Sequence, residues 1–466
     1  MEVNLFRWSF LSLTLLFGAC LGTVWHQPQQ THIAAGDTPD KIIIVWSTFN
    51  KTGDTTVLYG KNGKPTQKAT GSVTTFTDQG PEKRIQYIHR VILTGLEPKT
   101  DYTYMVGSEA YGFSDIFVFR TWPAGENWSP SLAIFGDLGN ENAQSLPRLE
   151  VDAAAGMYDA ILHVGDFAYD LDVDNARVGD EFMRQIEPLA SRLPYMTCPG
   201  NHENAHNFSN YRNRFWMPGD ENKRTYFSFN MGPVHFISLS TELLFYVQYG
   251  LVPIVEQYKW LERDLAEANK PENRQKRPWI IVFGHRPMYC SNDDNDDCTH
   301  HESLVRVGIP FLHILGMEKL LHEYGVDIAL WAHEHSYERL WPVYNRKVYN
   351  GSYSKPYTNP GAPVHITTGS AGCKEKHDNF DKKVDDWSAF RSDDYGYTRM
   401  KVYNSTHVYM EQVSDDKHGA IIDKLMVVKE KHGPYPHDPR PVVPVADPMK
   451  KLWKHFKDFV DVENLP

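Results

Sequence analysis

The sequence predicts two folded domains in series, an all-β sandwich over residues 30–124 and an α/β domain over residues 128–430. Short β-rich runs separated by turn residues fill the first segment, whereas apolar strands alternate with helical stretches in the second. Several of the later strands end in a polar side chain that can bind a metal ion. At about 100 to 200 residues per domain, the chain has room for two or three domains.

In the first domain, the β-rich runs show no helical period. They lie at residues 41–49, 55–60, 86–96, 101–108 and 115–122. The turn from Leu96 to Tyr102 resembles the tyrosine corner of fibronectin type III domains, and Trp46 is the expected core anchor. We therefore predict a fibronectin type III-like sandwich.

The α/β domain begins with a strand–helix–strand unit. A strand at 131–135 precedes a helical stretch at 143–158 and a second strand at 160–164, and this order implies two parallel strands. Further apolar runs at 195–198, 279–283 and 328–331 end in the same way. In α/β sheets, sites form beyond the carboxyl ends of the strands, so we expect the chemistry at that rim.

The side chains at this rim are of metal-ligand type. A lone Gly-Asp is usually a turn, and a lone His-x-His is more often a surface or core pair than a metal site. The order of the whole set is what indicates a metal centre. The set is Asp137, Asp166, Tyr169, Asn201, His202, His285, His333 and His335.

Composition excludes several classes of protein. The 48 Lys and Arg against 59 Asp and Glu give a net charge of −11, which opposes general binding to nucleic acid. Hydrophobic residues at 41% and charged residues at 23% exclude a disordered or collagenous chain. The 21 histidines are a first sign of metal chemistry.

The N-terminal residues 1–22 resemble a secretory signal peptide, with an uncleaved anchor as the alternative, and no later stretch is apolar enough to cross a membrane. Among the remaining cysteines, Cys290 and Cys298 bracket a short loop and are the preferred disulfide, while Cys198 and Cys373 are either bridged or buried thiols. Together these features favour a secreted or lysosomal glycoprotein. The glycosylation sequons are at Asn50, Asn127, Asn207, Asn350 and Asn404.

The order of the rim residues resembles the purple acid phosphatases within the calcineurin-like metallophosphoesterases. The resemblance covers about residues 35–430 and includes the fibronectin-like leading domain, Tyr337-Glu338-Arg339 and Gly396-Tyr397. It is greatest for the animal, long-chain branch. Ala332 departs from the glycine that many relatives have before the first histidine of the pair. The family implies a two-sheet α/β sandwich.

The resemblance also implies roles for the ligands. Asp137, Tyr169 and His335 are expected to bind a ferric ion, and Asp166 is expected to bridge it to a divalent ion of zinc, iron or manganese. The remaining ligands of the divalent ion are Asn201, His285 and His333. Phenolate is a hard anion that suits iron(III), and imidazole suits the divalent metals. If the two histidines of the pair lie on a strand, both point to one face and reach both metals.

Four further predictions concern groups around these ligands. His202 is expected to bind phosphate or to protonate the leaving group, with Asn201 also touching substrate. His301 is expected in the substrate loop, with His300 as its competitor. His163 is expected in the core or behind a ligand. A solvated loop is favoured over a calcium site for the four acidic residues Asp293, Asp294, Asp296 and Asp297.

Residues 433–466 read as a Pro-rich linker and a short amphipathic tail. Packing of Leu452, Phe456 and Phe459 against the body is favoured over binding to an anionic surface. The sequence does not define the oligomeric state, and a homodimer is compatible with it.

The resemblance implies a secreted acid phosphatase in which hydroxide on the metals attacks a small phosphate monoester. A phosphodiesterase or nucleotide pyrophosphatase of the same fold is the second reading. A third, of another class, is an adhesion or binding protein with a vestigial catalytic domain. The presence of all the expected ligands opposes this third reading.

Overall fold

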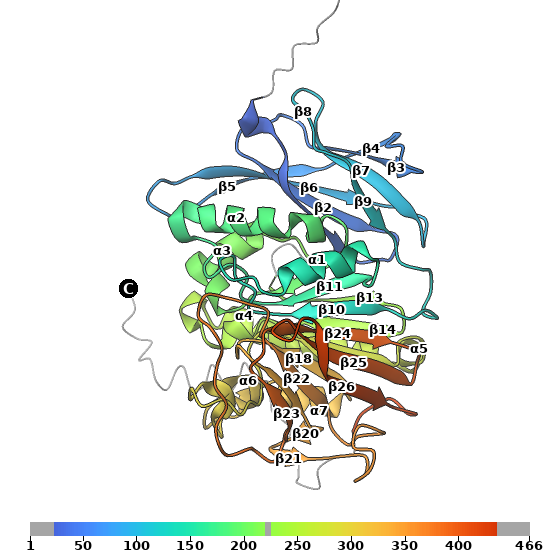
Figure 1. Cartoon of the computed structure of the whole chain (residues 1–466), viewed down its shortest axis with the longest axis vertical. Helices are drawn as coiled ribbons and strands as arrows, with labels where there is room; N and C mark the ends of the chain where they lie inside the picture. The colour runs from blue at the N-terminus through green and yellow to red at the C-terminus, as the bar shows by residue number, and fades with distance from the viewer. Residues whose placement is uncertain (1–22, 220–224, 436–466) are drawn as a thin grey trace, which may run out of the picture.

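The computed structural model describes residues 23–219 and 225–435, which form an N-terminal β-sandwich stacked on a larger α/β domain (Figure 1). The predicted signal peptide and the part of the predicted tail beyond residue 435 lie outside the described residues. Within the described ranges, no helix combines the length and the apolar character that crossing a membrane requires.

Two sheets form the N-terminal sandwich, as the sequence predicts. Their strand orders are β1-β2-β6-β5 and β4-β3-β7-β8, and β9 also pairs with β7. Trp46 is 1% exposed and lies in the core between the sheets. The Tyr102 hydroxyl accepts a hydrogen bond from the Glu97 N–H at 3.0 Å, which closes the predicted tyrosine corner. The strands are β1 Gln29–Ala35, β2 Ile42–Thr48, β3 Thr56–Lys61, β4 Gln67–Thr70, β5 Ser72–Thr77, β6 Ile85–Leu93, β7 Asp101–Ser108, β8 Gly112–Phe113 and β9 Phe117–Arg120, preceded by the short helix η1 Val24–His26.

Strand β2 is buried on both faces and packs between the core of the sandwich and the second domain. Alternate side chains of a strand point to opposite faces. Ile42 and Ile44 therefore fill the core of the sandwich, whereas Ile43 and Val45 join the core of the α/β domain. Helix α2 (Val173–Ala190) packs against β1, so the two domains share buried surface.

The α/β domain is a sandwich of two sheets, as the family resemblance implies. The six-stranded sheet has the order β12-β11-β10-β24-β25-β26, and the seven-stranded sheet has the order β13-β14-β15-β18-β22-β19-β23. The strands that carry the predicted ligands are parallel within each sheet. The strands are β10 Ser131–Phe135, β11 Ala160–Val164, β12 Tyr195–Cys198, β13 Phe227–Met231, β14 Val234–Ser238, β15 Trp279–Phe283, β18 Ile328–Trp331, β19 Tyr337–Leu340, β22 Val364–Thr368, β23 Ser388–Ser392, β24 Gly396–Val402, β25 His407–Ser414 and β26 Ala420–Val428. Two hairpins pair β16 Gly308–Ile309 with β17 Ile314–Leu315 and β20 Val343–Tyr344 with β21 Lys347–Val348.

Helices cover the sheets and fill the connections. Figure 1 shows α1, α2 and α3 on the side of the six-stranded sheet that faces the N-terminal sandwich. The predicted helix at 143–158 is shorter in the structure and ends before Gly156, whose φ of +72° is incompatible with a continuing helix. This helix is α1 Leu146–Ala154. The other helices are α3 Ala205–Arg214, α4 Val252–Ala268, α5 Pro271–Lys276, α6 Leu304–Val307 and α7 Glu318–Glu323, with short helices η2 Asn201–Glu203, η4 Thr241–Leu244, η5 Val247–Tyr249 and η6 Asp297–Thr299.

Candidate metal centre

The rim predicted from the strand ends exists, and both sheets contribute to it. Asp137 follows β10, Asp166 follows β11 and Asn201 follows β12 in the six-stranded sheet. His285 follows β15 and His333 follows β18 in the seven-stranded sheet. The strands thus bring side chains that are up to 196 residues apart in sequence into one buried cluster.

One group of donors in this cluster consists of a phenol, a carboxylate and an imidazole. The hydroxyl oxygen of Tyr169 lies 3.1 Å from Asp137 Oδ1 and 2.9 Å from His335 Nε2. Asp137 Oδ1 lies 3.6 Å from His335 Nε2. Donor atoms that bind one transition metal at about 2.0 to 2.2 Å are roughly 3 Å apart. The three side chains are therefore spaced to hold one ion.

A second group of donors lies around His285. Its Nε2 is 3.0 Å from Asn201 Oδ1, 3.2 Å from Asp166 Oδ2 and 3.2 Å from His333 Nδ1. These separations also fit one ion. Asp166, His285 and His333 each offer a ligand atom within a single group, and the other carboxylate oxygen of Asp166, Oδ1, accepts a hydrogen bond from the His202 N–H at 2.9 Å. All seven predicted ligands thus lie in two adjacent sets.

The backbone at the ligands is held in an unusual conformation. Asp137, Asp166, Tyr169 and His333 have φ values of +58°, +51°, +53° and +73°, which is the left-handed region that non-glycine residues seldom occupy. Such conformations persist only where the surroundings enforce them, and they cluster at functional sites. A side-chain carbon at Gly200 would lie 2.1 Å from Asp166 Oδ1, so glycine is required directly before Asn201.

The histidine pair departs from the expected strand geometry. Residues 332–336 form a tight bend between β18 and β19, in which Ala332 O accepts from Glu334 N–H and Glu334 O accepts from Ser336 N–H. The prediction that His333 and His335 lie on a strand is therefore wrong, and the bend is what directs them to separate groups. Ala332 fits because Gly136 faces it: a side-chain carbon at Gly136 would lie 2.3 Å from Ala332 Cβ.

Backbone carbonyls orient two of the imidazoles. His285 Nδ1 lies 2.9 Å from Val164 O, and His335 Nδ1 lies 3.0 Å from Lys376 O. If each Nδ1 carries the proton and donates it, Nε2 is left free to bind a metal. Cys373 is a buried free thiol 3.4 Å from His335 Nδ1, and Cys198 is also free and buried.

Glu203 is not predicted from the sequence. It is a buried carboxylate that hydrogen-bonds to two of the ligand loops. Its oxygens accept hydrogen bonds from the N–H groups of Asp166 at 2.9 Å, Phe167 at 3.0 Å and Gly200 at 2.8 Å. The signal that identifies it is the spacing of a helix-capping carboxylate three residues after Gly200. Burial, followed by the charge of Asp166, raises the pKa of Glu203 to about 8.

Replacing Glu203 by glutamine tests this positioning role. An amide turns an NH₂ group toward backbone donors, so we expect Glu203→Gln to lower activity by about 10- to 100-fold, with a matching loss of metal affinity. Metal content and kcat are measured together. The matched control is Glu141→Gln, an exposed carboxyl on the loop after β10. Unchanged metal content and rate in Glu203→Gln would refute the role.

The electrostatics of the cluster fit a bound cation. Burial, with the nearby charges of Asp137 and Asp166, raises the pKa of Tyr169, so its phenolate form requires a compensating positive charge. Burial lowers the pKa of His285, but Asp166 more than offsets this effect and raises it to about 10. A metal ion must displace that proton, which makes metal loading weaker in acid.

A polar cavity of about 420 Å³ opens at the ligands. His202 is on its wall, with Nδ1 2.6 Å from Asp170 Oδ1 and Nε2 3.9 Å from Asp166 Oδ2. The position of His202 on the cavity wall is compatible with its predicted contact with the substrate. The remaining wall consists of Arg286, Asp294, Asn295, Asp296, Glu375 and Asp378.

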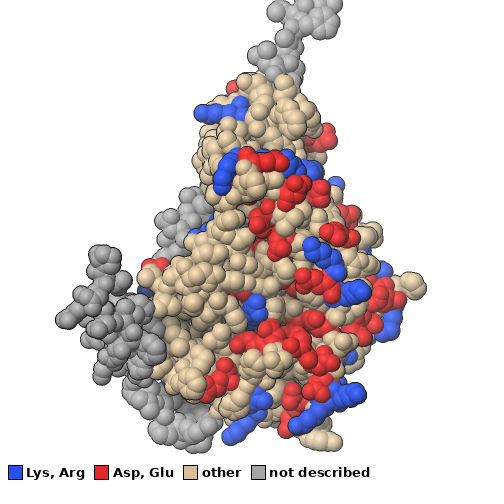
Figure 2. Space-filling view, turned by 90° about the vertical axis from the view of Figure 1, so that its left-hand side faces the viewer, with Lys and Arg blue, Asp and Glu red and all other residues tan. Residues whose placement is uncertain are grey.

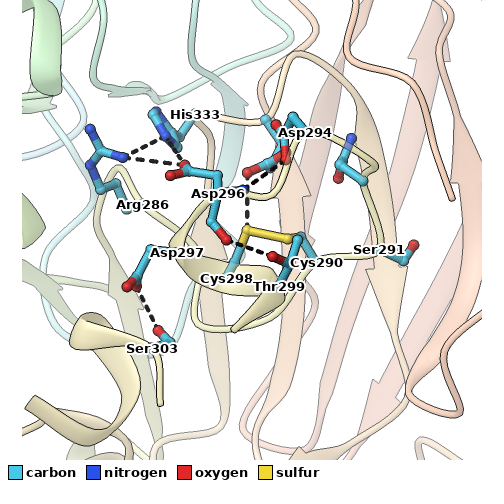
Figure 3. The surroundings of a disulfide bond; sticks show 12 residues. Arg286, Cys290, Ser291, Asp294, Asp296, Asp297, Cys298, Thr299, Ser303 and His333 are labelled. Atoms are coloured by element: carbon cyan, nitrogen blue, oxygen red, sulfur yellow. Dashed lines mark hydrogen bonds and ion pairs between the residues drawn. A yellow bond between two sulfur atoms is a disulfide. The ribbon is translucent and has the colours of Figure 1, made fainter. Parts of the chain in front are cut away.

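The loop after Cys290 differs from its prediction. Cys290 and Cys298 form a disulfide (Figure 3), and Asp296 points from this loop toward His333 and Arg286, with its Oδ2 3.2 Å from Arg286 Nη1. Asp296 is partly buried, whereas Asp297 is buried and accepts a hydrogen bond from Ser303 Oγ at 2.7 Å. The prediction of a solvated loop fits the exposure of Asp293 and Asp294, but it is wrong for the buried Asp297 and for Asp296, which lies against His333 and Arg286.

The structure does not bring His301 to the cavity. Its side chain is exposed, and its carbonyl accepts a hydrogen bond from Arg306. The disulfide and the short helix η6 turn the chain away from the ligands before this residue, and His300 is also exposed. The acidic loop takes the place expected for His301, whose predicted role no contact supports. His163 is a core residue of β11 that bonds Tyr195 at 2.6 Å.

The fold and the paired ligand groups define a metallophosphoesterase with two adjacent metal sites. Three family models match the chain: the purple acid phosphatase N-terminal domain at residues 28–121, the calcineurin-like phosphoesterase at 130–337, and the iron/zinc purple acid phosphatase-like C-terminal protein at 362–424. The chain belongs to the purple acid phosphatase family. Its donor set fits the iron and zinc that the last description names.

Individual relatives agree along the length of the chain. Acid phosphatase type 7 of Danio rerio is 57% identical over 88% of this chain and 93% of that protein. Acid phosphatase type 7 of Homo sapiens is 52% identical over 91% of this chain and 97% of that protein. A purple acid phosphatase from yellow lupin (Lupinus luteus) seeds shares the fold, with a TM-score of 0.72 at 24% identity over 90% of this chain and 78% of that one.

Proposed function

We propose that this chain is an acid phosphatase that hydrolyses phosphate monoesters at a binuclear iron(III)–divalent metal centre. The observation that carries the proposal is the pair of neighbouring donor groups, one around Tyr169 and one around His285, that open on one polar cavity. Asp137, Tyr169 and His335 hold iron(III), and the other ligands hold zinc, iron or manganese. Asn201, His285 and His333 would hold the second ion, and Asp166 would bind both ions.

When bound, the metals supply positive charge that activates water and offsets the charge of the phosphoryl group. The protein positions the substrate against them. The Asn201 amide lines the cavity, and Arg286 brings a guanidinium to its wall, where Glu242 Oε2 fixes it at 3.0 Å from Nε. The net effect is a site that holds one compact anion.

His202 is the group we propose as the proton donor to the leaving alkoxide. Its hydrogen bond from Nδ1 to Asp170 leaves Nε2 facing the cavity. Burial lowers the pKa of His202, but the hydrogen bond to Asp170 and the charge of Asp166 raise it to about 9, so the imidazolium is available in acid. Bound metal cations oppose this rise.

Replacing His202 tests the donor role through the leaving group. General-acid catalysis contributes about 10²- to 10⁴-fold. We expect His202→Asn to lose that much on an alkyl phosphate and far less on an aryl phosphate, whose leaving group needs no proton. The matched control is His206→Asn, an exposed histidine four residues further on. Equal losses on both substrates contradict proton donation and assign His202 to binding alone.

The experiment for the overall proposal compares a phosphate monoester with a diester. The metal-loaded protein is assayed on an aryl phosphate and on a bis-aryl phosphate between acid and neutral pH. Faster hydrolysis of the monoester, with its maximum in acid, supports an acid phosphatase. Preference for the diester assigns the site to a phosphodiesterase instead. Acidic side chains gather over the lower part of the face in Figure 2, a distribution unfavourable to an extended polyanion.

We also propose that the protein is a secreted or lysosomal glycoprotein. The Cys290–Cys298 disulfide requires an oxidising compartment, and the asparagines of all five sequons are exposed. Expression in a secretory host is expected to give a glycosylated product whose electrophoretic mobility changes on treatment with a glycosidase. An unglycosylated protein with both cysteines reduced would contradict this. Light scattering distinguishes a homodimer from a monomer.

A further inference from the structure

Glu334 is a buried carboxylate that the phosphatase reaction does not use. It lies between His333 and His335, is 1% exposed and points toward the disulfide. Its Oε1 lies 3.0 Å from Cys298 Sγ, which belongs to the disulfide and carries no hydrogen to donate. Among the described residues no group donates a hydrogen bond to its Oε2, and the side chain of Glu334 meets the carboxylate of Asp294. A buried carboxylate without a donor is costly unless something neutralises it.

Two other carboxylates converge on Glu334. Oxygen atoms of Asp294, Glu334 and Asp378 all lie within 4.8 Å of one another. Asp294 Oδ1 accepts from Asp296 N–H at 3.1 Å and Asp378 Oδ2 accepts from His335 N–H at 2.6 Å, which leaves one carboxylate oxygen of each available. Figure 3 shows Asp294 on the loop above the disulfide. Like charges at this separation repel one another in the absence of a cation.

We propose that Asp294, Glu334 and Asp378 form a third cation site, for calcium, in the wall of the cavity. Oxygens that bind one Ca²⁺ at 2.3 to 2.6 Å are at most about 5 Å apart, which matches this cluster. The donors are hard oxygens alone, which suit calcium rather than zinc or copper. The exposure of Asp294 leaves room for the water ligands that complete a flexible calcium shell.

The site has a consequence for the cavity next to it. Asp294 and Asp378 line the same wall that an anionic phosphate ester must pass. Bound calcium removes this repulsion, so it is expected to lower KM without entering the reaction. The proposal concerns binding to this chain and stands independently of the phosphatase assignment.

The test is a calcium titration of the full-length protein whose binuclear centre is already loaded with iron and zinc. Isothermal titration calorimetry with CaCl₂ at neutral pH is expected to show one Ca²⁺ per chain, with a Kd of about 10⁻⁴ to 10⁻³ M if the site resembles extracellular modules. Asp294→Asn is expected to weaken binding at least about tenfold because affinity follows the charge of the ligands. Asp293→Asn, the exposed neighbour outside the cluster, is the matched control and is expected to bind as the wild type does.

Two results would overturn the proposal. One is the absence of saturable binding at about 10 mM CaCl₂, which is above the weakest affinities of natural calcium modules and would mean that Glu334 holds a proton instead. The other is an equal effect of Asp294→Asn and Asp293→Asn, which would reduce the effect to surface charge. Glu334→Gln, with iron and zinc content measured alongside, is the second variant. Unchanged calcium affinity in a metal-loaded Glu334→Gln protein also contradicts the site.

Discussion

Asp166→Asn is expected to abolish activity and to release at least one of the two metals while the fold remains intact. Asp166 is 1% exposed, and its Oδ2 lies 3.2 Å from His285 Nε2. An amide has the same shape but offers one neutral oxygen, so it neither bridges two cations nor balances their charge. Since loss of a residue that merely supports a ligand costs 10- to 100-fold, we expect a loss of at least about 100-fold.

The measurement for this variant combines metal analysis with kcat and thermal unfolding. The matched control is Asp174→Asn, an exposed carboxyl in the same connection after β11. It is expected to keep both metals and full turnover. If Asp166→Asn also retains two metals per chain and normal turnover, Asp166 is not the bridge and the division of ligands proposed above is wrong.

Of these variants, Asp180→Asn is expected to lower the free energy of unfolding the most. Asp180 on α2 accepts hydrogen bonds at Oδ1 from Gln86 at 2.6 Å and from Arg214 at 2.9 Å, and its Oδ2 pairs with Arg84. Arg84 and Gln86 belong to the N-terminal sandwich, so this carboxylate joins the two domains. Removing one partner of a buried ion pair costs about 3–5 kcal/mol, because the remaining charges stay buried.

The stabilising contribution of Asp180 is expected to persist at acid pH. Burial raises the pKa of Asp180, but the charge of Arg214 and the bond from Arg84 outweigh it and lower the pKa. The contribution is therefore present above the unfolded value of about 3.9 and is lost only as pH falls through the lower folded value. The network should hold at the acid pH where the enzyme works.

Thermal unfolding at pH 5 and pH 7 checks this prediction. The matched control is Glu181→Gln, the exposed neighbour on α2, which is expected to change stability by less than about 0.5 kcal/mol. We expect Asp180→Asn to unfold at a lower temperature at both pH values. A change no larger than that of the control would show that the interface depends on apolar packing instead.

The sequence locates the rim of donor side chains because its signals are local. Five of the seven predicted ligands closely follow an apolar strand, and a glycine such as Gly165 or Gly200 permits the close approach. They are Asp137, Asp166, Asn201, His285 and His333. Parallel strands then bring the ends together, so spacing along the chain is enough to locate the rim. The same holds for the corner at Tyr102, which depends on the nearby residue Glu97.

What the sequence does not predict depends on contacts between distant segments. Strand β1 carries polar residues yet is buried, because α2 covers it from a domain that begins about a hundred residues later. From the sequence the acidic loop is expected to be solvated. In the structure, the disulfide and the bend at His333 place Asp296 against His333. The prediction that His301 lies at the cavity is wrong for the same reason, because the disulfide changes the path of the loop. The burial of Glu334 is not predicted from the sequence, because it depends on where the fold places the two histidines that flank it.

A visible absorption spectrum with metal analysis, measured on the purified protein and on Tyr169→Phe, tests the central claim most directly. The account predicts about two metals per chain and a purple band that arises from the Tyr169 phenolate on iron(III). It also predicts that Tyr169→Phe loses the band. A correctly folded wild-type protein that is colourless, binds no metal and hydrolyses no phosphate ester would contradict the account and favour a binding protein with a vestigial catalytic domain.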